Sequence, residues 1–323
     1  MLFRLRTSPV ARRIAGALFT LFGVSVAVFL MLRAIPGDQI TAAYGVEAAA
    51  LSEEQREALR SYYGLDQPLF LQYFTWVGAI FTGNLGYSMR SHQSVWDMTA
   101  LSFPVTLELA VLAVLFALLI GIPVGMLSAS RPNALRDWFG QGVGLAGLGI
   151  PSFLLATFLL GIAAQSWGFN PNGLGYARPW EDLWLNLQQM LLPSLVLGFA
   201  IAAPIMRTTR TAVLEVRSLD FVRTAKAKGV PASRLRWRHV LRNALVPVVT
   251  MTGMQFGFLL GGAVIVEQIF SLPGLGRQVL LAMNQQEYSV VQSTVLIIAL
   301  LFVIVNLLTD LLYRKIDPRV RAE

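Results

Sequence analysis

The sequence of 323 residues contains no cysteine, only two histidines and few charged residues. Without cysteine the chain has no disulfide bond, no thiolate nucleophile and no cysteine-ligated metal. His92 and His239 are far apart in the sequence, which argues against a histidine-based metal cluster. Charged residues make up 14% of the chain and hydrophobic residues 55%, whereas an average soluble domain is roughly a quarter charged. The composition therefore indicates an integral membrane protein.

Motifs of enzymes and of several other protein classes are also missing. The sequence has no G-x-x-x-x-G-K-[ST] phosphate loop, and no Ser, His and acid grouping has the spacing of a catalytic site. We expect no catalytic residue, no metal ligand and no enzymatic activity. The basic residues of the inner segment 207–242 are interleaved with only two aromatic residues, Phe221 and Trp237. This pattern argues against nucleic-acid binding. A self-contained secondary transporter would show internal repeats or broken, charged helices near the membrane midplane, and neither is clear.

Long apolar runs define the membrane topology. A spanning helix needs about 20 mainly apolar residues, and charge-free stretches predict six spans, at 14–32, 109–130, 139–165, 183–206, 244–266 and 288–309. The stretch 69–81 is apolar and aromatic but too short to span. It fits better as a helix lying at the membrane surface.

The distribution of basic residues orients these spans. With the N-terminus inside, the inner segments 1–13, 129–137, 207–242 and 310–323 carry 20 of the 26 Lys and Arg residues. A seventh span at 67–89 would place the ten basic residues of 207–242 outside, against the positive-inside rule. We therefore expect an all-α protein with six transmembrane helices and both termini in the cytoplasm.

The outer segment between the first two spans is the longest extramembrane piece and is acidic. Ser52 with Gln55 three residues later forms a capping-box start, which predicts a helix ending near Gly64. This segment is either a solvated helix that shapes an outer vestibule or a docking surface for an external partner. Its charge favours the first interpretation.

The inner segment 207–242 is the most informative part of the chain. Ser218 or Asp220 can cap a helix over 219–228, and Gly229 stands at the position of a C′ glycine. A second helix is expected to start near Ser233 and to merge into the fifth span before Pro247. Such a segment is most often a topology anchor, but its length and its apolar positions favour a knob that packs into the groove of a partner.

Two further sets of residues are candidates for function. Gly253, Gly257 and Gly261 share one face of the fifth span and allow close helix packing, either within this chain or against a second, similar chain. Glu108 and Glu267 lie at the outer ends of the second and fifth spans. Carboxylates near membrane depth face a partner or a wet cavity, so either could line a pathway, although a structural role is the more frequent one.

Two motifs of the inner segment resemble the cytoplasmic EAA loop of ABC importer permeases. Residues 223–229 read RTAKAKG, and residues 239–247 read HVLRNALVP. They are similar to the version carried by the dipeptide/oligopeptide/nickel permease subfamily, in which Arg223 stands where the general motif has Glu. Further stretches resemble this subfamily in order and spacing: 33–38, 63–68, 83–88, 103–110, 150–153, 192–193, 269–276, 310–313 and 317–321.

The resemblance implies a type I ABC importer-like transmembrane subunit in the bacterial or archaeal cytoplasmic membrane, surrounded by lipid. Its implied partners are a second homologous permease, two cytoplasmic ABC ATPase subunits and an external solute-binding protein. ATP and Mg would be held by the ATPases, with no cofactor in this chain. The coupling positions on 219–229 would be Asp220, Arg223, Thr224, Ala225, Lys226 and Gly229.

The resemblance also implies a division of the chain and a class of solute. Residues 1–35 would be the cytoplasmic N-terminus and first span, 36–103 an external helical segment, 104–313 the core permease domain with coupling loop 207–242, and 314–323 a cytoplasmic tail. The expected solutes are di- or oligopeptides, and nickel and glutathione are alternatives within the same subfamily.

Overall fold

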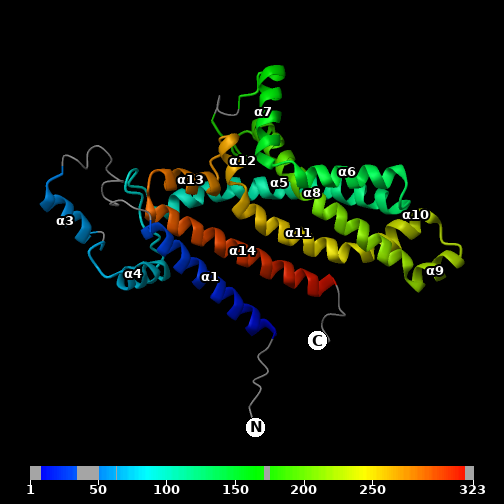
Figure 1. Cartoon of the computed structure of the whole chain (residues 1–323), viewed down its shortest axis with the longest axis horizontal. Coiled ribbons are helices and arrows are strands. Elements are labelled where there is room, and N and C mark those ends of the chain that lie inside the picture. Colours follow the sequence, from blue (N-terminus) through cyan, green and yellow to red (C-terminus); the bar gives the residue numbers. More distant parts are fainter. Residues whose placement is uncertain (1–8, 35–50, 63, 171–174, 317–323) are drawn as a thin grey trace, which may run out of the picture. The chain divides into compact units, whose positions relative to one another are not determined.

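The computed structural model describes residues 9–34, 51–62, 64–170 and 175–316, which are almost entirely helical (Figure 1). The helices in chain order are α1 (Pro9–Ala34), α3 (Glu53–Tyr62), α4 (Leu69–Phe81), α5 (Val95–Ser130), α6 (Leu135–Gly149), α7 (Ser152–Trp167), α8 (Leu183–Ser218), α9 (Asp220–Ala227), α10 (Ala232–Arg234), the π-helix η2 (Leu235–Leu241), α11 (Arg242–Gly262), α12 (Val264–Ile269), α13 (Leu275–Asn284) and α14 (Tyr288–Ile316). These ranges contain no strand beyond one isolated bridge. The predicted all-α fold is confirmed.

Five helical stretches of the described chain are long and apolar enough to cross a membrane. They are α1, α5, α8, the continuous stretch Ala232–Gly261, and α14. Helices α6 and α7 pass the same test together, so the chain has six spans when this pair counts as one. The prediction of six spans is confirmed in that sense, whereas the side on which the termini lie stays a prediction.

The third span is not the single helix expected over 139–165. It is bent by 97° between α6 and α7. Pro151 has no N–H to donate, and its ring disfavours the helical conformation in the residue before it. Ile150 accordingly lies in the extended region, with φ −87° and ψ 116°. The dipeptide Ile150–Pro151 ends one helix and starts the next.

The fourth span is longer than predicted. Helix α8 is preceded by the N-cap residue Asp182, whose carboxylate accepts the amide of Leu185 at 3.0 Å, and it continues to Ser218 instead of ending at residue 206. Its 36 residues correspond to about 54 Å at 1.5 Å per residue, against about 30 Å of hydrocarbon. Helix α8 therefore extends well outside the membrane, and residues 207–218 belong to this helix, not to a loop.

The fifth span is also divided differently from the prediction. The second inner helix begins at Ala232, as expected near Ser233, and passes through the π-helix η2 into α11. At the other end α11 stops at Gly262, and α12 carries the chain onward from Val264. Glu267 therefore lies on a short separate helix rather than at the end of the predicted span 244–266.

The chain forms two compact units. The first comprises the described residues up to Val105 together with Pro273–Val303, and the second comprises Thr106–Leu272 and the described residues from Ile304 onward. The residues discussed below as functional candidates all belong to the second unit. The four-segment division made from the sequence stays a prediction.

In the first unit, two predicted helices of the outer segment are present. The Ser52 hydroxyl accepts the amide of Gln55 at 3.2 Å, and the Gln55 side chain accepts the amide of Ser52 at 2.9 Å, which confirms the capping box. Helix α4 packs on α1 through aromatic rings, with Phe29 and Tyr73 edge to face at 5.3 Å. It has 13 residues, so it is too short to span.

In the second unit, glycines bring helices α5 and α8 close together. A Cβ placed on Gly125 of α5 would lie 2.6 Å from the carbonyl oxygen of Met206 in α8. One placed on Gly198 of α8 would lie 2.8 Å from the carbonyl oxygen of Ala113 in α5. The two backbones are thus in direct contact, as small residues allow in membrane helices.

Candidate functional site

The inner segment predicted to form a knob contains helix α9, close to the predicted range 219–228. Helix α9 ends at Ala227 and is followed by Gly229 at φ +76°, and the amide of Val230 bonds back to the carbonyl of Ala225 at 3.2 Å. A Cβ on Gly229 would meet no heavy atom within 4 Å. Glycine is favoured here by its left-handed backbone alone, as predicted for a C′ position.

One side chain fixes α9 to the rest of the unit. Val222 is buried in an apolar cluster built from the ends of α5, α8 and η2 and from the start of α11. The other members of the cluster are Ala129, Ala212, Val213, Val240 and Ala244. The helix is thus anchored on one side, and its other side is free to meet a partner.

The free side of α9 carries most of the predicted coupling residues. Arg223, Thr224 and Lys226 are exposed, and Ala225 is half-buried. Arg223 lies 3.6 Å from Asp220 on the same helix, and both side chains are largely exposed. Phe221 adds an exposed apolar ring to the basic surface. This combination suits an acidic or mixed groove with an apolar centre.

A buried ion pair, which was not predicted from the sequence, lies in the same unit. Asp137, in the first turn of α6, accepts two hydrogen bonds from the Arg210 guanidinium of α8, both at 2.8 Å. The Ser128 hydroxyl of α5 and the amide of Asn133 also donate to this carboxylate, at 2.5 and 2.9 Å. Asp137 is fully buried. The sequence signal was the one acid of the short inner loop 129–137 and one of three arginines in the C-terminal part of α8.

The glycine stripe is only partly explained by packing within the chain. A Cβ on Gly253 would collide with the side chain of Thr309 on α14 in the same unit, so this glycine permits an internal helix contact. Gly257 is buried and Gly261 is exposed. A role for the stripe in binding a second permease stays a prediction.

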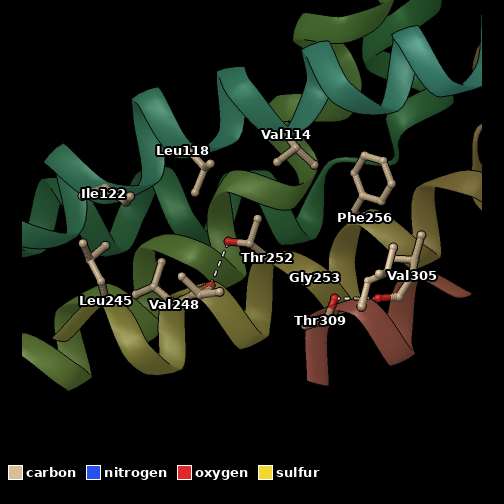
Figure 2. Close-up of a pocket in the computed structure, with 12 residues that line it drawn as sticks. Val114, Leu118, Ile122, Leu245, Val248, Thr252, Gly253, Phe256, Val305 and Thr309 are labelled. Carbon is tan, nitrogen blue, oxygen red and sulfur yellow. Dashed lines mark hydrogen bonds between the residues drawn. The ribbon is translucent and has the colours of Figure 1, made fainter. Parts of the chain in front are cut away.

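An apolar cavity of about 420 Å³ lies beside Gly253 (Figure 2). Its walls are α5, α11 and the part of α14 that belongs to the same unit. The hydroxyls of Thr252 and Thr309 both donate to carbonyls of their own helices, at 2.8 Å. The cavity therefore offers no free polar group from its threonines and suits hydrocarbon better than a charged solute.

A second hollow, of about 470 Å³, has a polar wall. Arg207, Thr208, Thr211 and Glu215 line it from α8, and α11 contributes Pro247 opposite. The Arg207 and Glu215 side chains are exposed. This hollow lies along the part of α8 that continues beyond the predicted fourth span.

The two candidate pathway carboxylates have partners inside the unit. Glu267 is fully buried and accepts the Thr106 hydroxyl at 2.7 Å. Glu108 is half-buried and accepts the Tyr176 hydroxyl at 2.8 Å. Burial raises the pKa of the Tyr176 phenol, and so does the carboxylate of Glu108, so the phenol remains protonated and donates. Both glutamates thus join helices or loops to each other, and a role in the pathway stays a prediction.

No group of three or more His, Cys, Asp or Glu residues in the described part of the chain could hold a metal ion. The candidate sites are instead the exposed side of α9 and the surfaces of the long helices.

Comparisons with known proteins agree with the resemblance seen in the motifs. The family of binding-protein-dependent transport system inner membrane components matches residues 121–322, and the corresponding N-terminal family matches residues 7–110. The glutathione transport system permease protein GsiC of Shigella flexneri serotype 5b is 39% identical over 97% of this chain and 98% of its own length. The protein of the same name from Pectobacterium atrosepticum is 41% identical, over 96% of this chain and 97% of its own.

A solved structure of an amino acid ABC transporter with histidines has a TM-score of 0.49 and 16% identity, covering 69% of this chain and 94% of that chain. A similarity of this degree adds nothing to the family relationship.

Proposed function

Because the chain belongs to the family of binding-protein-dependent transport system inner membrane components, it is a permease subunit of an ABC importer in the bacterial inner membrane, and we propose that it forms half of a pathway for short peptides. In this proposal a second, homologous permease supplies the other half. The pathway lies between the two permeases, and an external binding protein delivers the solute.

The observation that carries the mechanism is the geometry of α9. The helix is short, exposed, basic on its free side and anchored by a single buried valine. A helix of this kind transmits a push from a partner only if its base is firm, and the apolar cluster around Val222 supplies that base. We assign α9 as the coupling helix that sits in a groove of an ATPase subunit.

ATP and Mg belong to the ATPase subunits in this scheme. Closure of the ATPase pair on ATP would displace α9 and, through it, the membrane helices. The pathway would then change from open to the outside to open to the inside. This chain binds neither nucleotide nor metal in the proposal and acts only as the moving part.

Glutathione is the first solute to test, because the relatives in the comparison are named as glutathione permeases and glutathione is itself a tripeptide. Nickel is the alternative that the subfamily resemblance leaves open. Solute choice in such importers is shared with the binding protein, so the test needs the whole complex.

The experiment is to tag this chain, solubilise native membranes in a mild detergent and identify the proteins that copurify by mass spectrometry. Recovery of a second six-span protein with P-loop ATPases is the expected result. The complex, with its binding protein, is then reconstituted in vesicles and supplied with ATP and with labelled glutathione, other labelled tripeptides, labelled dipeptides or nickel. Purification of this chain alone as a stable homo-oligomer would contradict the proposal, and ATP-dependent nickel uptake without peptide uptake would contradict its solute class.

A further inference from the structure

Two arginines of α8 hold the turn between α5 and α6. Arg210 forms the bidentate pair with Asp137 at the start of α6. Arg217, seven residues further along, donates to the carbonyl oxygens of Ala129 and Ser130 at the end of α5, at 2.5 and 3.3 Å. Seven residues are about two turns of an α-helix. The two guanidinium groups therefore reach the same turn from one side of α8.

The contacts of Asp137, Arg210 and Arg217 with the α5–α6 turn are called the joint below. Within it, the Asp137 carboxylate is hydrogen-bonded from several directions. Asp137 receives donors from α5, from the turn and from α8, through Ser128, Asn133 and Arg210. Asn133 has a left-handed backbone, with φ 64°, which turns its amide toward the carboxylate. A buried carboxylate with this many donors keeps one geometry, because each alternative position leaves a charge without partners.

The same stretch of α8 continues directly into the coupling helix. Arg217 is the last residue but one of α8, and α9 begins at Asp220. Val222 of α9 belongs to the same apolar cluster as Ala129, the residue whose carbonyl oxygen accepts a hydrogen bond from Arg217. Helix α9 is thus linked to the end of α5 in two ways, through the shared apolar cluster and through Arg217 at the end of α8, two residues before α9 begins.

We infer that Asp137, Arg210 and Arg217 are positioning residues that join the coupling helix to the α5–α6 turn, so that a displacement of α9 moves α5 and α6 with it. This inference rests on the proposed function of α9. It adds that ATP hydrolysis and solute movement are linked through these three side chains. Without them α9 would still bind the ATPase, but its movement would be absorbed at the turn.

The first test is the amount of solute transported per ATP hydrolysed in reconstituted complexes. Arg210→Gln removes the bidentate pair, and Arg217→Gln removes only the contacts to backbone carbonyls. Arg136→Gln is the matched control, because Arg136 is an exposed arginine next to Asp137 on the same turn. We expect transport per ATP to fall by about fivefold or more in Arg210→Gln, at the lower end of couplings between distant sites, and less in Arg217→Gln. ATPase subunits should still copurify with both variants.

If Arg210→Gln does not assemble, Arg210→Lys and Arg217→Gln carry the test, since neither leaves the Asp137 carboxylate without a cation nearby. Wild-type transport per ATP in both Arg210→Lys and Arg217→Gln would overturn the inference. Measurements on the wild-type complex distinguish a wrong inference about the joint from a wrong proposed function. A wild-type complex that shows no ATP-dependent transport overturns the proposed function, whereas normal wild-type transport with fully coupled variants overturns only the joint.

The distance between spin labels on α6 and after α9 is a second readout, which a change in overall stability alone would not alter. The absence of cysteine allows one spin label at Leu135→Cys in α6 and one at Lys228→Cys after α9, both at exposed positions. The cysteine-free parent chain in the same complex reports any labelling of the partners. We expect the same narrow distance distribution in nucleotide-free and vanadate-trapped wild type, and a broadened one in Arg210→Gln. A wild-type distance that changes between the two states would show that α9 and α6 do not move together.

Discussion

Two acid–arginine pairs in the second unit consist of the same residue types in opposite surroundings. Asp137 and Arg210 join α6 to α8 at 2.8 Å, with side chains 0% and 24% exposed. Asp220 and Arg223 lie three residues apart on α9 at 3.6 Å, with side chains 95% and 74% exposed. The first pair connects distant parts of the fold, and the second connects nothing beyond its own helix.

This contrast separates charged residues that are bound within the fold from charged residues that remain accessible to a partner. A buried charge that loses its partner is strongly unfavourable, because water cannot replace the lost contacts. An exposed pair exchanges its contact for water at little net change. Asp137 and Arg210 are therefore committed to the architecture, whereas Asp220 and Arg223 are available to an ATPase surface.

Removal of one member of the buried pair should have the largest effect on stability. Asp137→Ala leaves the Arg210 guanidinium facing an empty site, and we expect a loss of about 3 kcal/mol in the free energy of unfolding, the lower end of the range for broken buried pairs. The lower end applies because Arg210 is 24% exposed. Thermal unfolding of the purified chain in detergent measures it. Asp220→Ala is the control, and equal losses in the two variants would remove the distinction between the pairs.

A glycine that permits helix contact should come next. Gly125→Ala places a methyl group 2.6 Å from the Met206 carbonyl oxygen, and overpacking of this kind destabilises by roughly 1–3 kcal/mol. A methyl group at Gly142 of α6 would have no heavy atom within 4 Å, so Gly142→Ala should be neutral or slightly stabilising. The same thermal measurement compares them. Equal stability in the two variants would mean that α5 and α8 can separate at no free-energy penalty.

The turn after α9 should affect transport more than stability. Gly229→Val forces a β-branched residue into a left-handed conformation, which is unfavourable by about 1–2 kcal/mol, although space for the side chain is open. We expect reduced ATP-dependent uptake with normal membrane insertion. Gly229→Asn should retain most of the uptake, because Asn tolerates this conformation. Wild-type uptake by the valine variant would contradict the assignment of α9 as coupling helix.

Charge reversal on the free side of α9 should leave the fold unchanged. Arg223→Glu alters an exposed residue with no partner outside its helix among the described residues, so the unfolding temperature of the chain should not change. Recovery of ATPase subunits with the tagged chain should fall about tenfold or more if Arg223 meets acidic groups, because like charges in an interface are strongly unfavourable. Arg131→Glu, on the exposed α5–α6 turn, is the control. Undiminished recovery would mean that Arg223 is not a significant contact.

The sequence predicted most helices because their signals are local. The apolar runs, the capping box at Ser52 and the glycine at 229 each act within a few neighbouring residues. The predicted end of the fourth span at residue 206 is not the end of α8, because the basic residues after position 206 limit the apolar run but nothing in 207–218 breaks a helix. The bend at Ile150–Pro151 had a visible signal, the proline, within a stretch that was otherwise uniformly apolar.

The buried pair could not be predicted in the same way. Asp137 and Arg210 are separated by 73 positions, and no local pattern states which of the many arginines an acid will meet. Their contact depends on the close approach of α5, α6 and α8, which glycines such as Gly125, Gly140 and Gly147 permit. The positions proposed for coupling on α9 could be predicted because the sequence motif and the helix coincide. The contacts of Asp137 depend on three helices that are far apart in the sequence.

The bend between α6 and α7 has a consequence for hydration of the membrane interior. In an unbroken helix the carbonyl of Gly147 would accept the amide of residue 151, but Pro151 has no amide hydrogen. The amides of Leu154 and Leu155 bond to the carbonyl of Pro151, at 3.0 and 3.2 Å, so Ser152 and Phe153 at the start of α7 are the ones whose amides have no helical partner. Hydrocarbon cannot satisfy any of these groups, so a broken span is stable only where protein or water covers the break. The same dipeptide that interrupts the third span therefore marks a place at which this membrane protein has to keep lipid away and can admit water.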